Sequence, residues 1–383
     1  MKKIYLDNAA TTKVDEEVVK AMLPYFNKKY GNPSSLHQFG REARDAIEEA
    51  RGKIAGLINA SPEEIIFTSG GTESDNLAIK GLALANPDKK HIITSKIEHP
   101  AVLETCRELE KQKYKVDYIS VDEQGMINLQ EIERKINSET LLVSIMQVNN
   151  EIGTIQPIEE IGKICQEKKV YFHTDAVQSF GKLGIDVKKM NILLLSASGH
   201  KINCVKGTGF LYVRKGIILK PLLNGGGHEK GLRNGTENVP GIVGFGKACE
   251  LAEKRMQQAG KIKKLRDKLI SELGKIQGTR LNGSKNERIF NNVNVSFDNV
   301  EGEALLLLLD KEGIACSTGS ACSSHSLKAS HVLKAIGLSD LQAHGSLRLT
   351  FGWENTKKEM EYTLEKIKKA VNKLRKISKN IEV

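Results

Sequence analysis

The sequence predicts an α/β fold in which helices flank a largely parallel sheet. Three observations support this prediction. Short apolar segments of strand length alternate with helical patterns, polar residues bound each segment, and no long linker, repeat or low-complexity tract interrupts them. The predicted strands are Ile65–Phe67, His91–Thr94, Leu141–Met146, Val170–Phe172, Ile192–Leu195 and Gly209–Val213.

Helical periodicity is clearest in two regions. Residues 40–58 repeat apolar side chains at spacings of three and four, and residues 360–374 do the same. Thr356 and Glu359 stand at capping-box spacing just before the second run, which predicts a helix start there. Further helices are predicted at Leu77–Ala85 and, as one long element, from about Val239 to Gly278.

The last third of the chain changes character, because strand-like segments follow the long helical pattern at Asn292–Phe297 and Leu347–Phe351. We therefore predict a large domain over residues 15–254. A smaller α+β domain is predicted over residues 255–383, with residues 1–14 packed on it.

Composition excludes several classes of protein. The 383 residues carry 58 basic and 47 acidic side chains, a net charge of +11, but no nucleic-acid motif or arginine-rich arm gathers the basic ones. No apolar run approaches the ~20 residues of a membrane span, and the N-terminus turns polar too soon for a signal peptide. We expect a cytoplasmic protein that binds neither nucleic acid nor membrane.

The cysteines exclude a disulfide scaffold, because six in a chain of this length are too few and the inferred compartment is reducing. No CxxC pair is present, so no metal site is predicted. The six residues are Cys106, Cys165, Cys204, Cys249, Cys316 and Cys322.

Five of the six strands predicted in the large domain run directly into side chains that can carry chemistry. In open α/β sheets, ligands bind outside the carboxyl ends of the strands, so these clusters predict a single large site. They are Thr68–Thr72, Glu98–His99, Asn149–Asn150, Asp175 with Gln178, and Ser198–Lys201.

The segment Ser69–Asn76 is a candidate phosphate cradle. Glycines allow backbone amides to approach an anion, and the helix that follows presents its N-terminus to negative charge. Gly71 and Thr72 are the candidate ligands. A tight strand–helix turn with a Ser or Thr cap explains the same residues, and the pattern is neither a Walker A loop nor a dinucleotide fingerprint.

Lys201 follows a strand directly, where a lysine can form a Schiff base with an aldehyde cofactor, and Ser198 and His200 flank it. A solvated loop lysine is the alternative. Asp175 suits a protonated pyridine nitrogen, although an Asp at that point also caps helices. Together these parts match one pyridoxal 5'-phosphate site, with Gln178 near the phenolic oxygen and His99 stacked on the ring.

Longer motifs extend this interpretation over nearly the whole chain. Read together, they resemble the group I cysteine desulfurases of the nitrogen-fixation and housekeeping iron–sulfur type, which are fold type I pyridoxal-phosphate enzymes of the class-V aminotransferase family. The matching segments are Tyr5–Thr12, Gly31–His37, Phe67–Asn76, Glu98-His99, Val148–Gly153, His173–Gln178, Ser198–Lys201, Gly225–Glu229, Arg233–Thr236, Ser317–Cys322 and Leu347–Thr350.

The resemblance implies a role for each matching residue. It makes Cys322 the nucleophile, Lys201 the Schiff-base lysine and His99 the acid–base imidazole, and it implies that Asn8, Asn150 and Arg348 bind the substrate. It implies that Thr236 reaches the phosphate of a second subunit. The cofactor-binding set that it implies is Gly71, Thr72, His99, Asn150, Asp175, Gln178, Ser198, His200, Lys201 and Thr236.

The implied activity converts L-cysteine to L-alanine and leaves the sulfur on Cys322 as a persulfide. A homodimer would then deliver it to an iron–sulfur cluster scaffold or another acceptor. No resident metal is implied, and Cys322 is at most a transient ligand to a cluster on the scaffold. The acceptor, the choice between iron–sulfur assembly and tRNA thiolation, and the preference for cysteine over selenocysteine stay open.

Two rival functions share the fold. A selenocysteine lyase, or another pyridoxal-phosphate lyase or aminotransferase, would release free product and need no cysteine in a Gly/Ser-rich loop such as Ser317–Ser324. A scaffold without activity is disfavoured by the retained Lys201, Asp175, His99 and Cys322. The family pattern departs only after Lys201, where an aromatic residue, Gly and Pro are replaced in Ile202–Gly207. That change places Cys204 near the site, either as a core filler or as a second thiol.

Overall fold

The structure is a computed structural model that describes residues 3–318 and 329–381. Within them, seven strands form the main sheet in the order β2-β8-β7-β6-β5-β3-β4. β8 is antiparallel to both of its neighbours, and every other neighbouring pair in this sheet is parallel. The strands are β2 (Ile65–Thr68), β3 (His91–Ser95), β4 (Lys115–Ile119), β5 (Thr140–Ser144), β6 (Tyr171–Asp175), β7 (Leu194–Ser198) and β8 (Gly209–Val213).

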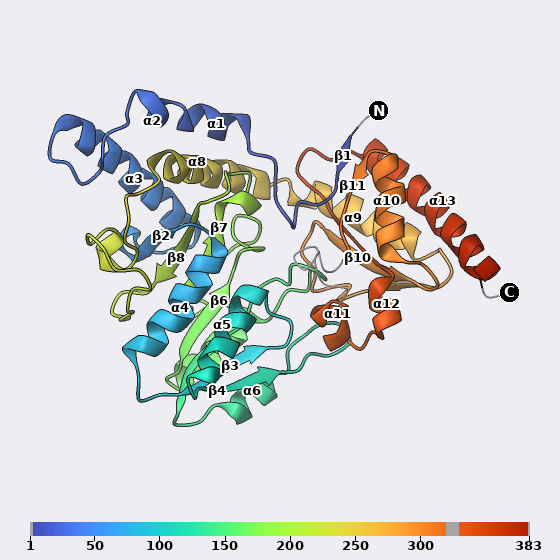
Figure 1. The fold of residues 1–383 in the computed structure, drawn as a ribbon, viewed down its shortest axis with the longest axis horizontal. Helices are drawn as coiled ribbons and strands as arrows, with labels where there is room; N and C mark the ends of the chain where they lie inside the picture. The colour runs from blue at the N-terminus through green and yellow to red at the C-terminus, as the bar shows by residue number, and fades with distance from the viewer. Residues whose placement is uncertain (1–2, 319–328, 382–383) are drawn as a thin grey trace.

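Helices cover both faces of this sheet (Figure 1). Alternating strand residues divide between two apolar clusters, as the two-residue period of a strand requires: Ile65 and Leu195 face one cluster, Ile66 and Leu194 the other. Helices α4 (Gly71–Ala85) and α5 (Pro100–Lys111) cover one face. The other face is covered by α1 (Glu16–Met22), α3 (Gln38–Leu57), α6 (Leu129–Lys135), α7 (Ile158–Glu167) and α8 (Val239–Met256).

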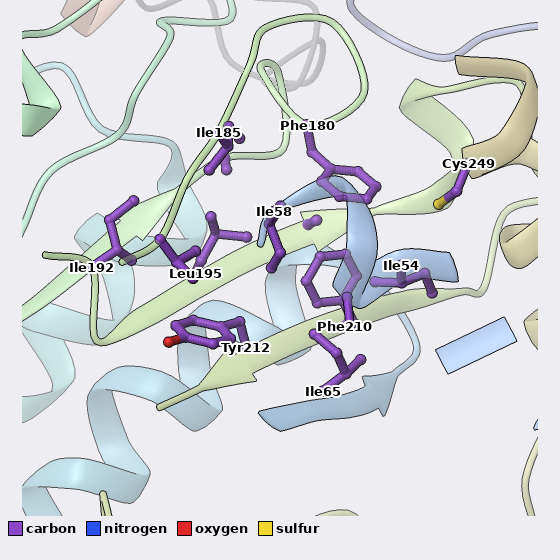
Figure 2. Close-up of a cluster of buried hydrophobic side chains, with 14 of the residues drawn as sticks. Ile54, Ile58, Ile65, Phe180, Ile185, Ile192, Leu195, Phe210, Tyr212 and Cys249 are labelled. Carbon is purple, nitrogen blue, oxygen red and sulfur yellow. The ribbon is translucent and has the colours of Figure 1, made fainter. Parts of the chain in front are cut away.

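The larger cluster contains an aromatic centre. Phe180 and Phe210 meet edge to face with ring centroids 4.9 Å apart, beside Ile54 of α3, Ile58 just after α3 and Cys249 of α8 (Figure 2). Such close packing makes the sheet a rigid base for the residues at its edge. Short elements complete this part of the chain: α2 (Pro24–Asn27), η1 (Pro62–Glu64), η2 (Gly199–Lys201) and η3 (Glu229–Gly231).

The C-terminal part builds a separate core around the antiparallel sheet β12-β10-β9. The N-terminal strand β1 (Ile4–Tyr5) pairs in parallel with β11 (Ile314–Ala315), so the start of the chain lies on this part. Its other elements are α9 (Ala259–Leu273), β9 (Thr279–Leu281), β10 (Asn292–Phe297), α10 (Gly302–Lys311), α11 (His331–Ala335), α12 (Asp340–His344), β12 (Ser346–Thr350) and α13 (Lys357–Ile381). The domain limits at residues 15 and 255 stay a prediction.

The α/β fold is confirmed, and the predicted elements need three corrections. The single helix expected over Val239–Gly278 is two helices, because α8 packs in the main core while α9 packs in the C-terminal one. The edge strand β4 and the short β9 were missed, since charged residues such as Lys115 and Asp117 interrupt the apolar pattern of β4. Strands β6 and β7 extend further than predicted, through Asp175 and Ser198.

Candidate active site

The five predicted clusters meet at one edge of the main sheet, because β2, β3, β5, β6 and β7 all run in the same direction. The predicted strand without such a cluster is β8, the antiparallel one. A cavity of about 220 Å³ lies where the five clusters meet. It is lined by Ala9, Ala10, Gly71, Thr72, Asp75, His99, Met146, Asn150, Asp175, Val177, Gln178, Ser198, His200, Lys201 and Arg348.

The N-terminus of α4 faces this cavity. Gly70 is the residue before the helix, and no side chain caps it, so the expected alternative of a Ser or Thr cap is not found. A Cβ on Gly71 would lie 2.6 Å from Cγ2 of Val177, so this position requires glycine. The first amides of a helix carry partial positive charge, which favours an anion here.

Lys201 and its neighbours Ser198 and His200 also line the cavity. The amine of Lys201 donates hydrogen bonds to the carbonyls of Ala9 and Ala10, both at 2.7 Å. His200 contacts Thr11, with 3.1 Å between Nδ1 and Oγ1. Burial, followed by the charge of Lys201, lowers the pKa of His200 to about 4, so its imidazole is neutral at physiological pH.

Asp175 is buried at the end of β6. Its Oδ1 accepts a hydrogen bond from the backbone N–H of Val177 at 2.8 Å. Burial raises the pKa of Asp175 to about 6, while that N–H and the charge of Lys201 oppose the rise. Gln178, three residues further on, donates from Nε2 to the carbonyl of Ala9 at 2.9 Å.

His99 caps α5 and also lines the cavity. Its Nδ1 accepts the backbone N–H of Ala101 at 3.1 Å, which assigns the ring proton to Nε2. Burial and then the charges of Lys201 and His331 lower the pKa of His99 to about 4. The ring is therefore neutral, with an N–H donor at Nε2.

Arg348 brings the C-terminal part into the site. It lies on β12, and its Nη1 donates to the carbonyl of Asn150 at 3.1 Å while its Nη2 pairs with Asp7 at 2.9 Å. Its buried Nε has no hydrogen-bond partner among the described residues. We call Arg348, Asp7 and Asn150 the arginine cluster. It presents an unsatisfied buried donor, as a carboxylate-binding site requires.

Three predicted residues do not line the cavity. Asn8 is buried one position before the cavity wall, where its Nδ2 donates to the carbonyl of Thr350 at 2.8 Å. Thr236 is exposed, in the segment before α8. Cys322 lies outside the described residues.

Cys204 is a core residue. It is 1% exposed and packs in the main apolar cluster below the turn that carries Lys201. The altered segment after Lys201 is anchored by Asn203, whose backbone N–H donates to Oγ1 of Thr12 at 2.7 Å. Asn203 adopts a positive φ of 67°, which Asn tolerates better than most residues. These contacts favour the filler interpretation of Cys204.

Sequence reasoning missed Asp75, which lines the cavity at 1% exposure. The sequence does contain a pattern that indicates this position for Asp75. Asp75 lies four residues after Gly71, one helical turn further along the same face of α4. Asp75 and Asp175 share the cavity with buried His173 behind them. We call Asp75, His173 and Asp175 the carboxyl cluster.

None of the helices in residues 3–318 and 329–381 combines the length and apolar character needed to cross a bilayer. No group of three or more histidine, cysteine or acidic side chains in the same residues is arranged to hold a metal ion.

Comparison with known proteins gives consistent matches over the chain. Residues 4–363 match the family model described as Aminotransferase class-V. The chain is 55% identical over 379 residues to a cysteine desulfurase IscS from Methanosarcina thermophila, covering 98% of this chain and 94% of that protein.

Solved structures resemble this chain over most of its length. A NifS-like protein superposes with a TM-score of 0.91 at 41% identity, covering 97% of this chain and 100% of its own. A structure described as SspA in complex with cysteine superposes with a TM-score of 0.82 at 42% identity, covering 91% and 99%.

Proposed function

This chain belongs to the class-V aminotransferase family and, within it, to the cysteine desulfurases, and we propose that the sheet-edge cavity is where it takes sulfur from L-cysteine. One observation carries the proposal. Residues from five strand ends of the main sheet and from β12 converge on a single cavity of about 220 Å³, and they supply an amine, an acid, an imidazole and a guanidinium.

We propose pyridoxal 5'-phosphate as the cofactor, consistent with the family's dependence on it. The residues present fit this group. The uncapped N-terminus of α4, with Gly71 where a Cβ would collide with Val177, suits a phosphate together with Thr72, Ser198 and His200. Asp175 suits a protonated ring nitrogen, and His99 suits a face of the ring. Asn150 and Gln178 suit the polar edge of the ring.

When bound, the cofactor supplies an electron sink for the substrate's α-carbon. Lys201 would hold the cofactor, and its amine would take the α-proton of the substrate. Its amine lies against the carbonyls of Ala9 and Ala10, which orient it within the cavity. His99 holds a proton on Nε2 and is placed to exchange it with the substrate thiol.

Arg348 binds the carboxylate of cysteine in this proposal. Its buried Nε has no hydrogen-bond partner among the described residues and Arg348 lines the cavity, and both facts support that role, because a buried donor is costly without an acceptor. The predicted help from Asn8 stays a prediction, since its side-chain amide is engaged with Thr350.

The sulfur acceptor within the enzyme is Cys322. Its thiolate attacks the sulfur of cysteine, the S–S bond forms as the C–S bond breaks, and the carbon keeps the electron pair and takes a proton to give alanine. Burial raises the thiol pKa of each of the five described cysteines, to about 12 for Cys316 and about 11 for Cys204. Since the thiolate is the nucleophile, these five are poor candidates.

We propose a homodimer that passes the persulfide to an iron–sulfur scaffold or another acceptor protein. Thr236 supports the dimer, because it is exposed and away from its own cavity, as a residue that completes a partner's phosphate site would be. Exposed apolar side chains near the N-terminus offer contact area for a second copy: Leu23, Phe26, Tyr30, Leu36 and Phe39. The cytoplasmic location stays a prediction.

Mass spectrometry of the enzyme after reaction with cysteine tests the proposal. We expect a 32-Da sulfur adduct on the peptide that contains Cys322, with one alanine formed per sulfur, on the order of one sulfur per site. Cys322→Ser should keep the bound cofactor and form no adduct, whereas Cys316→Ser should behave as wild type. An adduct on another cysteine, or alanine formation at the wild-type rate by Cys322→Ser, would overturn the nucleophile assignment.

A further inference from the structure

Asp75 is a second carboxyl group in the cavity wall, in addition to Asp175. It is 1% exposed, and its Oδ1 has no hydrogen-bond partner among the described residues. An ionised carboxylate in that condition is expensive, because the hydroxyl of Ser196 is the only group among the described residues whose hydrogen bond favours its charged form. The surroundings of Asp75 therefore decide which form it takes.

The polar groups behind Asp75 supply little compensation for a negative charge. His173 lies 3.6 Å away, measured from Nε2 to Oδ1, too far for a good hydrogen bond. Two hydroxyls hold this imidazole, Oγ of Ser144 at 2.8 Å from Nδ1 and Oγ of Ser196 at 3.0 Å from Nε2. Burial lowers the pKa of His173 to about 3, so it stays neutral beside Asp75.

Asp175 has stronger partners than Asp75, whose charged form is favoured by the Ser196 hydroxyl alone. Its Oδ1 accepts the backbone N–H of Val177, and the charge of Lys201 acts on it across the cavity. Two carboxylates in one dry cavity repel each other, so the proton goes to the one with fewer donors. Buried Glu98 is a third acid that acts on Asp75, and it adds to the repulsion only where it is ionised, because burial raises its own pKa to about 8.

We propose that Asp75 is a positioning residue that stays protonated and thereby fixes the single negative charge of the carboxyl cluster on Asp175. This inference rests on the proposed function, in which Asp175 pairs with the cofactor's ring nitrogen. One anion then faces one cationic ring, and no second anion repels the substrate's carboxylate. Burial, followed by the charge of Asp175, raises the pKa of Asp75 well above the usual carboxyl range, in agreement with this arrangement.

Asp75→Asn tests the proposal because asparagine keeps the shape and stays neutral. In the loaded enzyme we expect kcat within about threefold of wild type, and the same pH dependence of the cofactor's visible absorption. Asp175→Asn is the matched control and should lose roughly 100-fold in kcat. Asp75→Ala, which removes the polar group, should shift the pH midpoint of the cofactor spectrum, a change that loss of packing alone does not produce.

A second measurement uses the cofactor-free protein and needs no desulfurase activity. Glu98 and Glu151 also hold protons near neutral pH, because burial raises their pKa values to about 8 and about 7, so the readout is an infrared difference spectrum. Wild type minus Asp75→Asn should contain a protonated-carboxyl band, and wild type minus Asp175→Asn should not. The proposal is overturned if the first difference spectrum lacks that band, or if Asp75→Asn loses as much kcat as Asp175→Asn. Failure of the proposed desulfurase chemistry would leave the infrared result intact, so the two hypotheses are separable.

Discussion

The carboxyl cluster and the arginine cluster face the same cavity but are organised differently. Asp75, His173 and Asp175 come from α4 and β6, both within the main sheet and its helices, and all three are buried. Arg348 and Asp7 come from β12 and from the segment after β1, on the C-terminal part of the chain.

Their electrostatics differ as well. The carboxyl cluster contains no cation of its own, and the placement of a single proton sets its charge. The arginine cluster is held by an ion pair of 2.9 Å between Arg348 and Asp7. A neutral substitution is therefore mild at Asp75, whereas at Asp7 it removes the counter-ion of Arg348. Burial of an ionisable side chain therefore does not by itself predict how the protein responds when that side chain is replaced by a neutral one.

Lys201→Ala should have the largest effect, because Lys201 lines the cavity that both clusters face and takes the α-proton in the proposed reaction. We expect activity to fall roughly a thousand-fold or more while the fold is kept, since the amine donates to the carbonyls of Ala9 and Ala10 in the cavity wall and Lys201 is not part of the apolar cores. Turnover and far-ultraviolet circular dichroism measure this. Lys206→Ala, at an exposed lysine of the same loop, is the control. Borohydride reduction that fixed the cofactor to another lysine would contradict the assignment.

Arg348→Ala should have the next largest effect. It removes the carboxylate-binding group and leaves Asp7 without its partner, so KM for cysteine should rise about 30-fold, on the order of 2 kcal/mol. Steady-state kinetics with cysteine measure the change, and cofactor absorption checks that the carboxyl cluster is intact. An unchanged KM would show that the substrate carboxylate binds elsewhere.

Asp7→Asn should act in the opposite direction on binding. The substitution keeps a hydrogen-bond acceptor for Nη2 of Arg348 but removes the competing negative charge, so KM for cysteine should fall by roughly threefold. The protein should also become less stable, by on the order of 1 kcal/mol, because a buried guanidinium loses its counter-ion. Kinetics and denaturant unfolding measure the two effects. A rise in KM would mean that Asp7 orients Arg348 rather than competing with the substrate.

Glu151→Gln should have the smallest effect on activity and a clear effect on stability. Glu151 is buried next to the arginine cluster, where it accepts a hydrogen bond from Ser330 at 2.6 Å. Burial raises its pKa from 4.5 to about 7, against the opposing effects of Ser330 and Arg348. The folded wild type therefore keeps a proton that the unfolded chain releases, and its stability falls as pH rises from about 4.5 to 7.

The substitution removes this pH dependence. The free energy of unfolding of Glu151→Gln, relative to wild type, should increase over that interval by at most ~1.4 kcal/mol per pH unit and level off above it. Urea unfolding at several pH values measures the difference. Parallel stability curves for the two proteins would show that Glu151 is ionised in the folded state throughout.

The sequence by itself determined the sheet and most of the site. The strands of a buried parallel sheet are continuous apolar runs, so polar residues at their ends are easy to recognise in the sequence. Lys201, Asp175 and His99 are such residues. Edge strand β4 escaped because its exposure permits the charges of Lys115 and Asp117. The long helical pattern hid the break between α8 and α9, since both halves keep helical periodicity while they face different cores.

Only the tertiary structure decided how distant segments meet. The pairing of Arg348 with Asp7 joins residues 341 positions apart, and no local pattern encodes which charges will be paired after burial. The same holds for Asp75, which reads as an ordinary polar residue of a helix until the cavity and Asp175 are seen beside it. Residue type and spacing specify which groups reach the sheet edge, whereas hydration, donors and neighbouring charge in the folded protein set their ionisation.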